Sequence, residues 1–194
     1  AEWIAFAKSD GGSDWRTWKI MNISSGEILD DEIEWSKFSG AEWSPDSSGF
    51  FYRKYLKPDG EELLDLNSSP KLMFHVIGTN QTNDQIIIWN KNDPLLSSSI
   101  TVSDDGQYKI LYTEKGTDER NLISVSRYED EGFISIIDEF VASYTFIDSE
   151  GNYLWFLTDH MAPNRKVVRL DFNNLNLGFE EIISETASSI RSVD

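Results

Sequence analysis

Side chains able to act as nucleophiles or general bases are few and scattered in this chain. Its 194 residues include two histidines, His75 and His160, and no cysteine. A hydrolase of the nucleophile-elbow type needs a G-x-S-x-G turn followed by an aspartate and a histidine, and no G-x-S-x-G occurs here. His75 lies within an apolar run, which indicates a packed strand residue, whereas His160 lies in a polar turn. The sequence therefore predicts no catalytic residue in this chain.

Metal and cofactor sites have no better support. A zinc site needs about three histidine, cysteine or carboxylate ligands close together, and no such group is recognisable, so we expect neither a metal nor a cofactor. Acidic runs such as Asp30-Asp31-Glu32 and Glu129-Asp130-Glu131 are interpreted as solvated loops. Paired-acid glycosidase chemistry is an alternative, but the segments that we expect to be inner strands offer only Glu42 and Asp148.

The elements that would position any such residue are short apolar runs. They are rich in β-branched and aromatic residues: WIAFA (3–7), GFFY (49–52), LMFHVI (72–77), QIIIW (85–89), YKILY (108–112), FISII (133–137), YLWFL (153–157) and KVVRL (166–170). Short strands separated by Asp-, Ser- and Gly-rich turns are typical of an all-β sandwich, barrel or propeller. Weak helical periodicity occurs only in EELLDL (61–66) and near the C-terminus. The sequence therefore predicts an all-β fold.

A repeated turn favours a propeller over a two-sheet sandwich. An apolar residue, an Asp/Ser turn that ends in glycine and an aromatic-led strand recur at 43–50, 102–108 and 147–153. In this turn we expect Asp and Ser to cap backbone amides and glycine to supply a positive φ. A period near 45 residues with about four strands per unit is the blade repeat of a β-propeller.

The strands divide into four expected blades, at residues 1–39, 40–97, 98–142 and 143–191. The first is incomplete, because the strand that should precede WIAFA is missing. We therefore interpret residues 1–194 as a β-propeller fragment of about four four-stranded antiparallel blades, a piece of a larger ring. Such a piece would expose apolar blade faces and strand edges, and we expect self-association through these cut blade faces.

The charge balance excludes several classes of partner. The chain carries 17 Lys and Arg against 34 Asp and Glu, a net charge of −17. Duplex nucleic acid and anionic lipid both bind through basic residues, so we expect no nucleic acid and no membrane as partner. No apolar run approaches the ~20 residues that span a bilayer, and the first residues lack the pattern of a secretory signal. We expect a soluble protein of the cytoplasm or periplasm.

Four ordered blocks of sequence resemble the propeller domain of the prolyl oligopeptidase (prolyl endopeptidase) family. They are GSDWRT (12–17), KLMFHVIGT (71–79), SDDGQY (103–108) and LTDHMAPN (157–164), and the similarity runs over nearly the whole chain. In that family a seven-bladed propeller caps an α/β-hydrolase domain that carries a Ser-Asp-His triad and cleaves short peptides after proline. This chain resembles only the middle of that propeller, so the catalytic domain would lie outside it.

The resemblance implies a role and two kinds of partner. The propeller would limit access to short peptides and line part of the substrate cavity, without catalysing the reaction alone. Its partners would be the catalytic α/β-hydrolase domain of the parent serine peptidase and short proline-containing peptides. A non-enzymatic propeller that binds a protein partner on one face is the alternative.

The resemblance also implies five candidate site residues. Phe38 matches an aromatic residue at the specificity pocket of the family, and Asp14 resembles an interface acid that faces an arginine of the catalytic domain. Ser97 falls where some members have methionine, whereas Glu114 and Thr117 fall near positions that are arginine and cysteine. These three departures suggest an altered peptide preference. Blade packing for Phe38 and turn capping for Asp14 are the alternative interpretations.

Overall fold

The computed structural model describes residues 2–58 and 68–193, in two compact units, Ala1–Ile100 and Thr101–Asp194. The weak helical pattern of EELLDL (61–66) lies outside the described residues. Elsewhere in the described chain the helices are two three-residue 3-10 turns, η1 (Gln81–Asn83) and η2 (Leu175–Leu177), and the other elements are strands. The all-β prediction is confirmed, and the C-terminal helical pattern gives only η2 before a strand. Among these residues no helix is long and apolar enough to cross a membrane.

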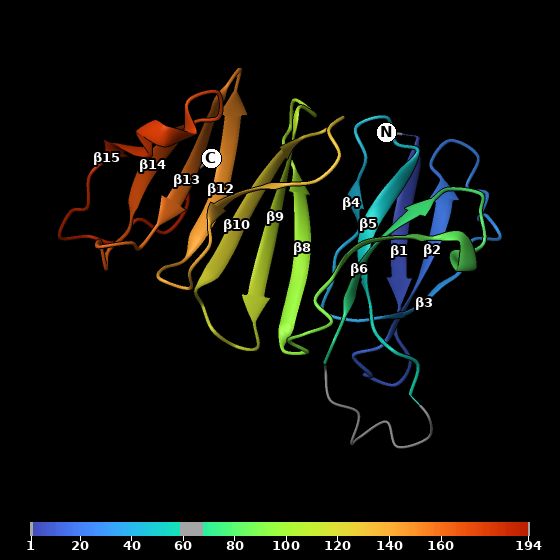
Figure 1. Ribbon diagram of the computed structural model, residues 1–194. Coiled ribbons are helices and arrows are strands. Elements are labelled where there is room, and N and C mark those ends of the chain that lie inside the picture. The colour runs from blue at the N-terminus through green and yellow to red at the C-terminus, as the bar shows by residue number, and fades with distance from the viewer. Residues whose placement is uncertain (1, 59–67, 194) are drawn as a thin grey trace. The chain divides into compact units, whose positions relative to one another are not determined.

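The first unit contains one antiparallel sheet in the order β1-β2-β3-β5-β6-β7, with β4 paired to β5 (Figure 1). Its strands are β1 (Trp3–Lys8), β2 (Arg16–Asn22), β3 (Ile33–Ser36), β4 (Glu42–Trp43), β5 (Gly49–Lys54), β6 (Lys71–Val76) and β7 (Gln85–Trp89). A single pair, Ser36 with Lys54, joins β3 to β5. The junction between these two strands is therefore narrow.

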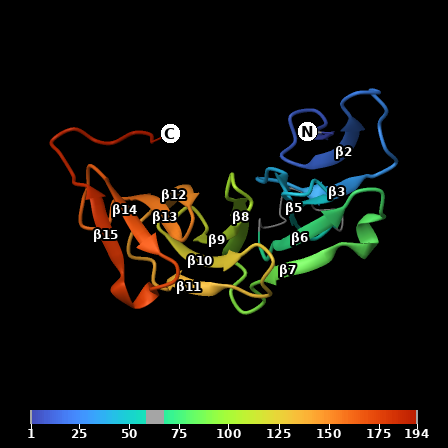
Figure 2. The same ribbon diagram turned by 90° about the horizontal axis from the view of Figure 1, so that it is seen from above.

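Two four-stranded antiparallel sheets follow, β11-β10-β9-β8 and β12-β13-β14-β15. Their strands are β8 (Leu96–Val102), β9 (Tyr108–Lys115), β10 (Asn121–Arg127), β11 (Ile134–Ile137), β12 (Tyr144–Glu150), β13 (Tyr153–Thr158), β14 (Lys166–Asp171) and β15 (Phe179–Ile183). Figure 2 shows β12 to β15 side by side. Within each sheet, strands that are consecutive in sequence are neighbours, which is the connectivity of a propeller blade. The blade boundaries, and the cytoplasmic or periplasmic location, stay predictions from the sequence.

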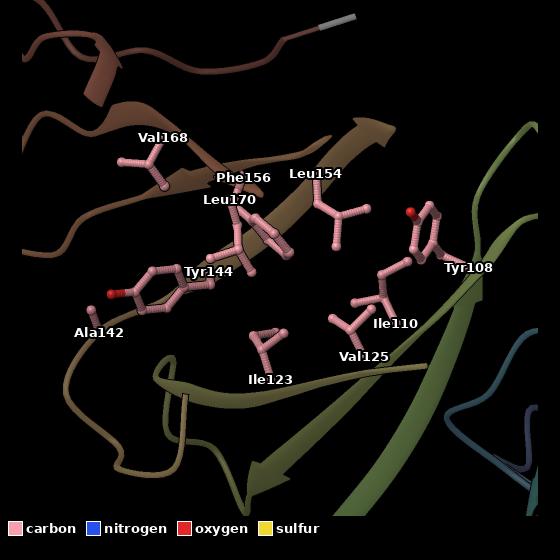
Figure 3. Close-up of a cluster of buried hydrophobic side chains, with 10 residues drawn as sticks. All are labelled: Tyr108, Ile110, Ile123, Val125, Ala142, Tyr144, Leu154, Phe156, Val168 and Leu170. Atoms are coloured by element: carbon pink, nitrogen blue, oxygen red, sulfur yellow. The ribbon is translucent and has the colours of Figure 1, made fainter. Parts of the chain in front are cut away.

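The core of the second unit lies between strands of these two sheets. Ile110 and Ile123 from one sheet face Leu154 and Phe156 from the other, and all four are fully buried (Figure 3). The run YLWFL therefore presents alternate residues to the core, and Leu157 on its other face is buried as well. A strand covered on both faces is what a sheet stacked between neighbours requires.

The repeated turn follows the expected chemistry in two of its three copies. The Ser103 hydroxyl accepts from the Tyr108 amide at 2.9 Å, and the Asp105 carboxylate accepts from the Gln107 amide. Ser44 likewise accepts from the amide five residues on, that of Gly49, and Asp46 accepts from Ser48. The third copy is instead a two-residue hairpin, because Glu150 pairs directly with Tyr153.

The expected role of the turn glycine is wrong for the first copy. Gly106 has a positive φ of 70°, but the equivalent corner in the first copy is Ser47, at 58°. Gly49 stands inside β5, where an added Cβ would collide with the carbonyl oxygen of His75 and lie 2.7 Å from the Phe74 ring. Glycine is needed there for the close approach of two strands, and not for its backbone freedom.

Candidate functional site

The loop after β3 presents an aromatic ring to solvent from a left-handed backbone. Phe38 has a φ of 51° and remains 47% exposed. Left-handed backbone costs a non-glycine residue about 1 kcal/mol or more. The buried guanidinium of Arg53 in β5 holds the loop, donating from Nη1 to the Phe38 carbonyl at 3.3 Å and from Nε to the Ser98 carbonyl at 3.2 Å. The surroundings thus stabilise a conformation that does not bury the ring.

The neighbouring residue, Lys37, is buried among aromatic rings. Its ammonium lies 3.9 Å from the ring centroid of Trp15 and 4.9 Å from that of Tyr55. Trp15 in turn packs edge-on against Trp35 and Tyr55. Cation–π contacts of a desolvated lysine contribute up to about 2 kcal/mol. The same ammonium lies 6.0 Å from the ring centroid of Phe38, so this cluster helps to fix the loop next to Phe38.

Two hollows of the surface share the indole of Trp35 as a wall. One, of about 370 Å³, also includes Trp15, Arg16 and Glu34 in its lining. The other, of about 240 Å³, is lined on its remaining sides by the end of β5 and the residues that follow it, 54–57, and by Ser69 and Lys71 at the start of β6. Trp35 lies in β3 and has a positive φ of 60°, so it is a second aromatic residue with a strained backbone close to Phe38 in the chain.

The structure brings three of the five candidate residues to one end of the first unit. Phe38 and Ser97 are linked through Arg53, which binds the carbonyls of Phe38 and of the residue after Ser97. Asp14 is joined to the same loop through its neighbour Trp15, the ring beneath Lys37. Asp14 is exposed and has no hydrogen bond or ion pair to the described residues, and Ser13 is the residue that caps the Trp15 amide.

The other two candidates belong to the second unit. Glu114 is half-buried near the end of β9 and pairs in register with Asn121, while Thr117 is exposed in the β9–β10 turn. Beside Thr117, hydrogen bonds from Arg120 lower the pKa of the partly exposed Asp118 to about 2. This hairpin therefore presents a carboxylate that stays charged in acid.

A buried polar cluster in the first unit was not foreseen. His75 is fully buried in β6, as predicted for a packed strand residue, but it lies between two carboxylates. Its Nδ1 is 2.8 Å from Asp84 Oδ1 and its Nε2 is 3.5 Å from Asp31 Oδ1. Asp31 is thus buried, so the solvated-loop interpretation of 30–32 is wrong for this residue. It was missed because nothing local in the sequence marks the contact.

Tyr52 extends this cluster. Its hydroxyl donates to Asp84 at 2.7 Å and accepts from the Gln81 amide at 3.0 Å. Burial, and secondarily the hydrogen bond to Asp84, raise the pKa of Tyr52 well above its ordinary value. The cluster is closed to solvent at His75, and its hydrogen bonds tie neighbouring segments of the first unit together. Within residues 2–58 and 68–193 no group of three or more His, Cys, Asp or Glu could hold a metal ion.

Comparison with known proteins accounts for this architecture. Residues 1–193 match the family described as prolyl oligopeptidase, N-terminal β-propeller domain. The chain belongs to this family. The fold is therefore part of a β-propeller, and the resemblance to prolyl oligopeptidases is confirmed.

Individual relatives agree. A prolyl endopeptidase of Elizabethkingia meningoseptica is 31% identical over 189 residues, covering 96% of this chain and 27% of its own. The dual function macrocyclase-peptidase of Galerina marginata is 28% identical and is covered over 28% of its length. A structure of prolyl oligopeptidase B from Galerina marginata with a 25mer macrocyclization substrate superposes with a TM-score of 0.89, at 27% identity, over 95% of this chain and 28% of that one.

The chain spans about a quarter of the length of the curated relatives that it matches. Those homologues join the propeller to a catalytic domain and bind peptide substrates. The residues described here are thus the propeller portion of the family, and the catalytic domain is not among them.

Proposed function

We propose that residues 1–194 act as the propeller portion of a prolyl oligopeptidase-like serine peptidase, where they line the substrate cavity and limit entry to short proline-containing peptides. The proposal is supported by family membership over residues 1–193 and by the peptide substrates of the homologues. In this role the chain supplies walls and contacts, and the catalytic domain of the same peptidase supplies the chemistry.

Phe38 is the observation that carries the proposal. A ring used for blade packing would be buried, yet Phe38 is 47% exposed and its backbone is strained. Strained backbone held in place by surrounding hydrogen bonds is characteristic of functional positions. An exposed aromatic ring fixed in this way offers a rigid apolar surface for a proline ring or a neighbouring side chain of a peptide.

The test compares two substitutions to glycine in the complete peptidase. F38G removes the ring and relieves the left-handed backbone, and M161G does the same at a control residue that has a φ of 52° and is 87% exposed. Neither variant should lower the melting temperature, since glycine adopts a positive φ without a steric penalty. We expect F38G to lower kcat/KM for a proline-containing peptide about tenfold or more, as loss of a buried aromatic contact does, and M161G to leave it unchanged.

Two results would contradict the proposal. Equal kcat/KM for F38G and the parent would show that Phe38 does not contact the peptide in the substrate cavity. Absence of all prolyl peptidase activity would favour the alternative, a propeller that binds a protein partner.

The remaining candidates have separate parts in this proposal. The exposed carboxylate of Asp14 would face an arginine of the catalytic domain, so D14N should lower kcat/KM or loosen the domain contact, which crosslinking would report. Ser97, Glu114 and Thr117 would alter peptide preference, with Glu114 favouring a basic side chain. E114Q should then reduce the preference for Lys- or Arg-containing peptides over neutral ones, and an unchanged ratio would rule Glu114 out.

Exposed apolar side chains on outer strands support the proposed self-association of the separate segment. β7 exposes Ile86 and Trp89, and β15 exposes Ile182 and Ile183. Edge strands with apolar side chains are templates for pairing with another chain. Light scattering should show oligomers of the segment that dissociate in I86K, whereas a monomer at all concentrations would argue against this contact.

A further inference from the structure

Three lysines surround the smaller of the two hollows beside Trp35. Lys54 ends β5, Lys71 begins β6, and the two are directly opposite in the antiparallel register. Lys57 follows a few residues after Lys54, and all three line the cavity of about 240 Å³. Like charges directly opposite on neighbouring strands destabilise a sheet. Three lysines around one cavity therefore repel one another, and this repulsion would be offset by a bound negative charge.

No ion pair joins these lysines to a carboxylate within the part of the chain that the structure describes. None of the three takes part in an ion pair with residues 2–58 or 68–193, although the chain carries twice as many acids as bases. Lys57 lies 5.1 Å from the Trp35 ring and Lys71 lies 4.1 Å from the Trp89 ring. Aromatic faces thus hold two of the ammonium groups in position without cancelling their charge.

The surroundings of Lys54 disfavour its positive charge. Burial lowers the pKa of the Lys54 ammonium, and the charge of Lys71 lowers it further, against the opposing effect of Asp84 and Glu34. An anion between the two lysines would relieve this repulsion.

The other walls are mainly apolar, and Tyr55 and Ser69 are the residues among them that carry a hydroxyl. Trp35, Tyr55 and Leu56 complete the cavity together with Ser69. The Ser69 hydroxyl oxygen accepts from the indole Nε1 of Trp89 at 3.0 Å, which leaves its O–H to donate to a ligand. Ammonium groups and a hydroxyl donor beside aromatic and aliphatic walls suit an anion that is attached to an apolar body.

We propose that this lysine pocket, formed by Lys54, Lys57 and Lys71 with Trp35, Tyr55 and Ser69, binds a carboxylate of a peptide together with an adjacent apolar side chain. The net charge of −17 repels a polyanion such as a nucleic acid, whereas a single carboxylate enters with little long-range repulsion at physiological salt. This binding site rests on the proposed function, because the proposed function is what makes a peptide the expected ligand.

The test measures the binding of three short peptides to the complete peptidase by calorimetry. The peptides contain no proline, so that cleavage does not interfere. They are acetyl-Ala-Ala-Phe with a free carboxyl terminus, its C-terminal amide, and an amidated peptide in which glutamate precedes phenylalanine. We expect the acid to bind about tenfold more tightly than the first amide, because the charge-assisted contacts depend on the carboxylate. Recovery of binding by the glutamate peptide would identify a side-chain carboxylate as a second source.

Lysine variants locate the binding. K71Q should lower the affinity for the acid about tenfold and abolish the preference for acid over amide, while K91Q should change neither. Lys91 is a matched control because it also lies over the Trp89 ring, at 4.4 Å, but does not line the cavity. Lys57 lies beyond the end of β5, so K57Q removes a second ammonium group of the pocket without altering a strand, and it should also weaken binding of the acid. Equal affinities for acid and amide, or equal losses in K91Q and K71Q, would overturn the proposal.

Activity separates this proposal from the proposed function. If the peptidase hydrolyses an amidated proline-containing peptide but binds the free-acid and amide peptides equally well, the lysine pocket alone is overturned. Binding of acids at the pocket without any peptidase activity would overturn the peptidase role alone.

Discussion

His75 and Asp84 form a fully buried hydrogen bond, with Nδ1 and Oδ1 2.8 Å apart. Asp31 approaches the second ring nitrogen at 3.5 Å, and its other oxygen accepts from the Gly78 amide. The imidazole thereby connects β6 to the segments that precede β3 and β7. Charged or polar groups inside a protein are tolerated only where such partners are present, so this cluster specifies how those segments pack.

Replacing the imidazole should therefore be costly. H75L introduces an apolar side chain of similar size and removes the imidazole from both buried carboxylates, which among the described residues keep only the Gly78 amide on Asp31 and the Tyr52 hydroxyl on Asp84. We expect a loss of about 3–5 kcal/mol in the free energy of unfolding. H160Q is the control, because His160 is a half-buried turn residue that stacks on Tyr144, and it should cost less than about 1 kcal/mol. Urea unfolding measures both, and equal losses would show that the cluster adds no stability.

Tyr52 should make the fold sensitive to alkali. Its pKa is raised by burial and by Asp84, so the native state keeps a proton that the unfolded chain releases above about pH 10. The contribution is complete below that pH and is lost as the pH rises further. Urea unfolding between pH 8 and 11 should show a shallower decline in stability for Y52F than for the parent. The control is Y153F, at an exposed tyrosine, and its free energy of unfolding should fall with pH as steeply as that of the parent.

Gly49 should not tolerate even one methyl group. In G49A the new Cβ would meet the His75 carbonyl and the Phe74 ring, and overpacking of this kind costs about 1–3 kcal/mol. Gly40 has no heavy atom within 4 Å of the equivalent position and no positive φ, so G40A should change stability by less than about 1 kcal/mol. Similar urea midpoints for the two variants would contradict the close strand approach.

Local patterns in the sequence were sufficient for the strands that are apolar runs and for the amide caps of two of the repeated turns, but not for β15, which lies where the sequence indicated weak helical periodicity. Ser103 and Asp105 cap amides within five residues of themselves, so their roles follow from the turn sequence alone. The partners of His75 do not, because Asp31 reaches it only after β3, β5 and β6 have paired. Asp31 also stands between two other acids, which is why it was interpreted as solvated.

The candidate site shows the same division. The resemblance pointed to Phe38 and Asp14, but not to Arg53 or Lys37, the buried cations that hold the loop after β3. A buried lysine or arginine looks like any surface cation in the sequence, since its aromatic and carbonyl partners come from distant strands. The lysine pocket was missed for the same reason, because Lys54 and Lys71 become neighbours only through the register of β5 and β6.

Asp118 gives a local test of the electrostatics in the second unit. Arg120 donates to both oxygens of its carboxylate, and these hydrogen bonds lower the pKa of Asp118 to about 2. A lowered folded-state pKa means that the carboxylate stabilises the hairpin above its ordinary pKa of about 3.9 and that this contribution is lost as the pH falls toward 2. Carboxyl NMR titration should place the midpoint near 2 and raise it in R120Q, and high salt should raise it by screening the exposed pair. The pKa of Asp46, lowered by hydrogen bonds from Ser44 and Ser48 in the first unit, should be the same in R120Q, whereas an unmoved midpoint for Asp118 would show that Arg120 does not set its charge.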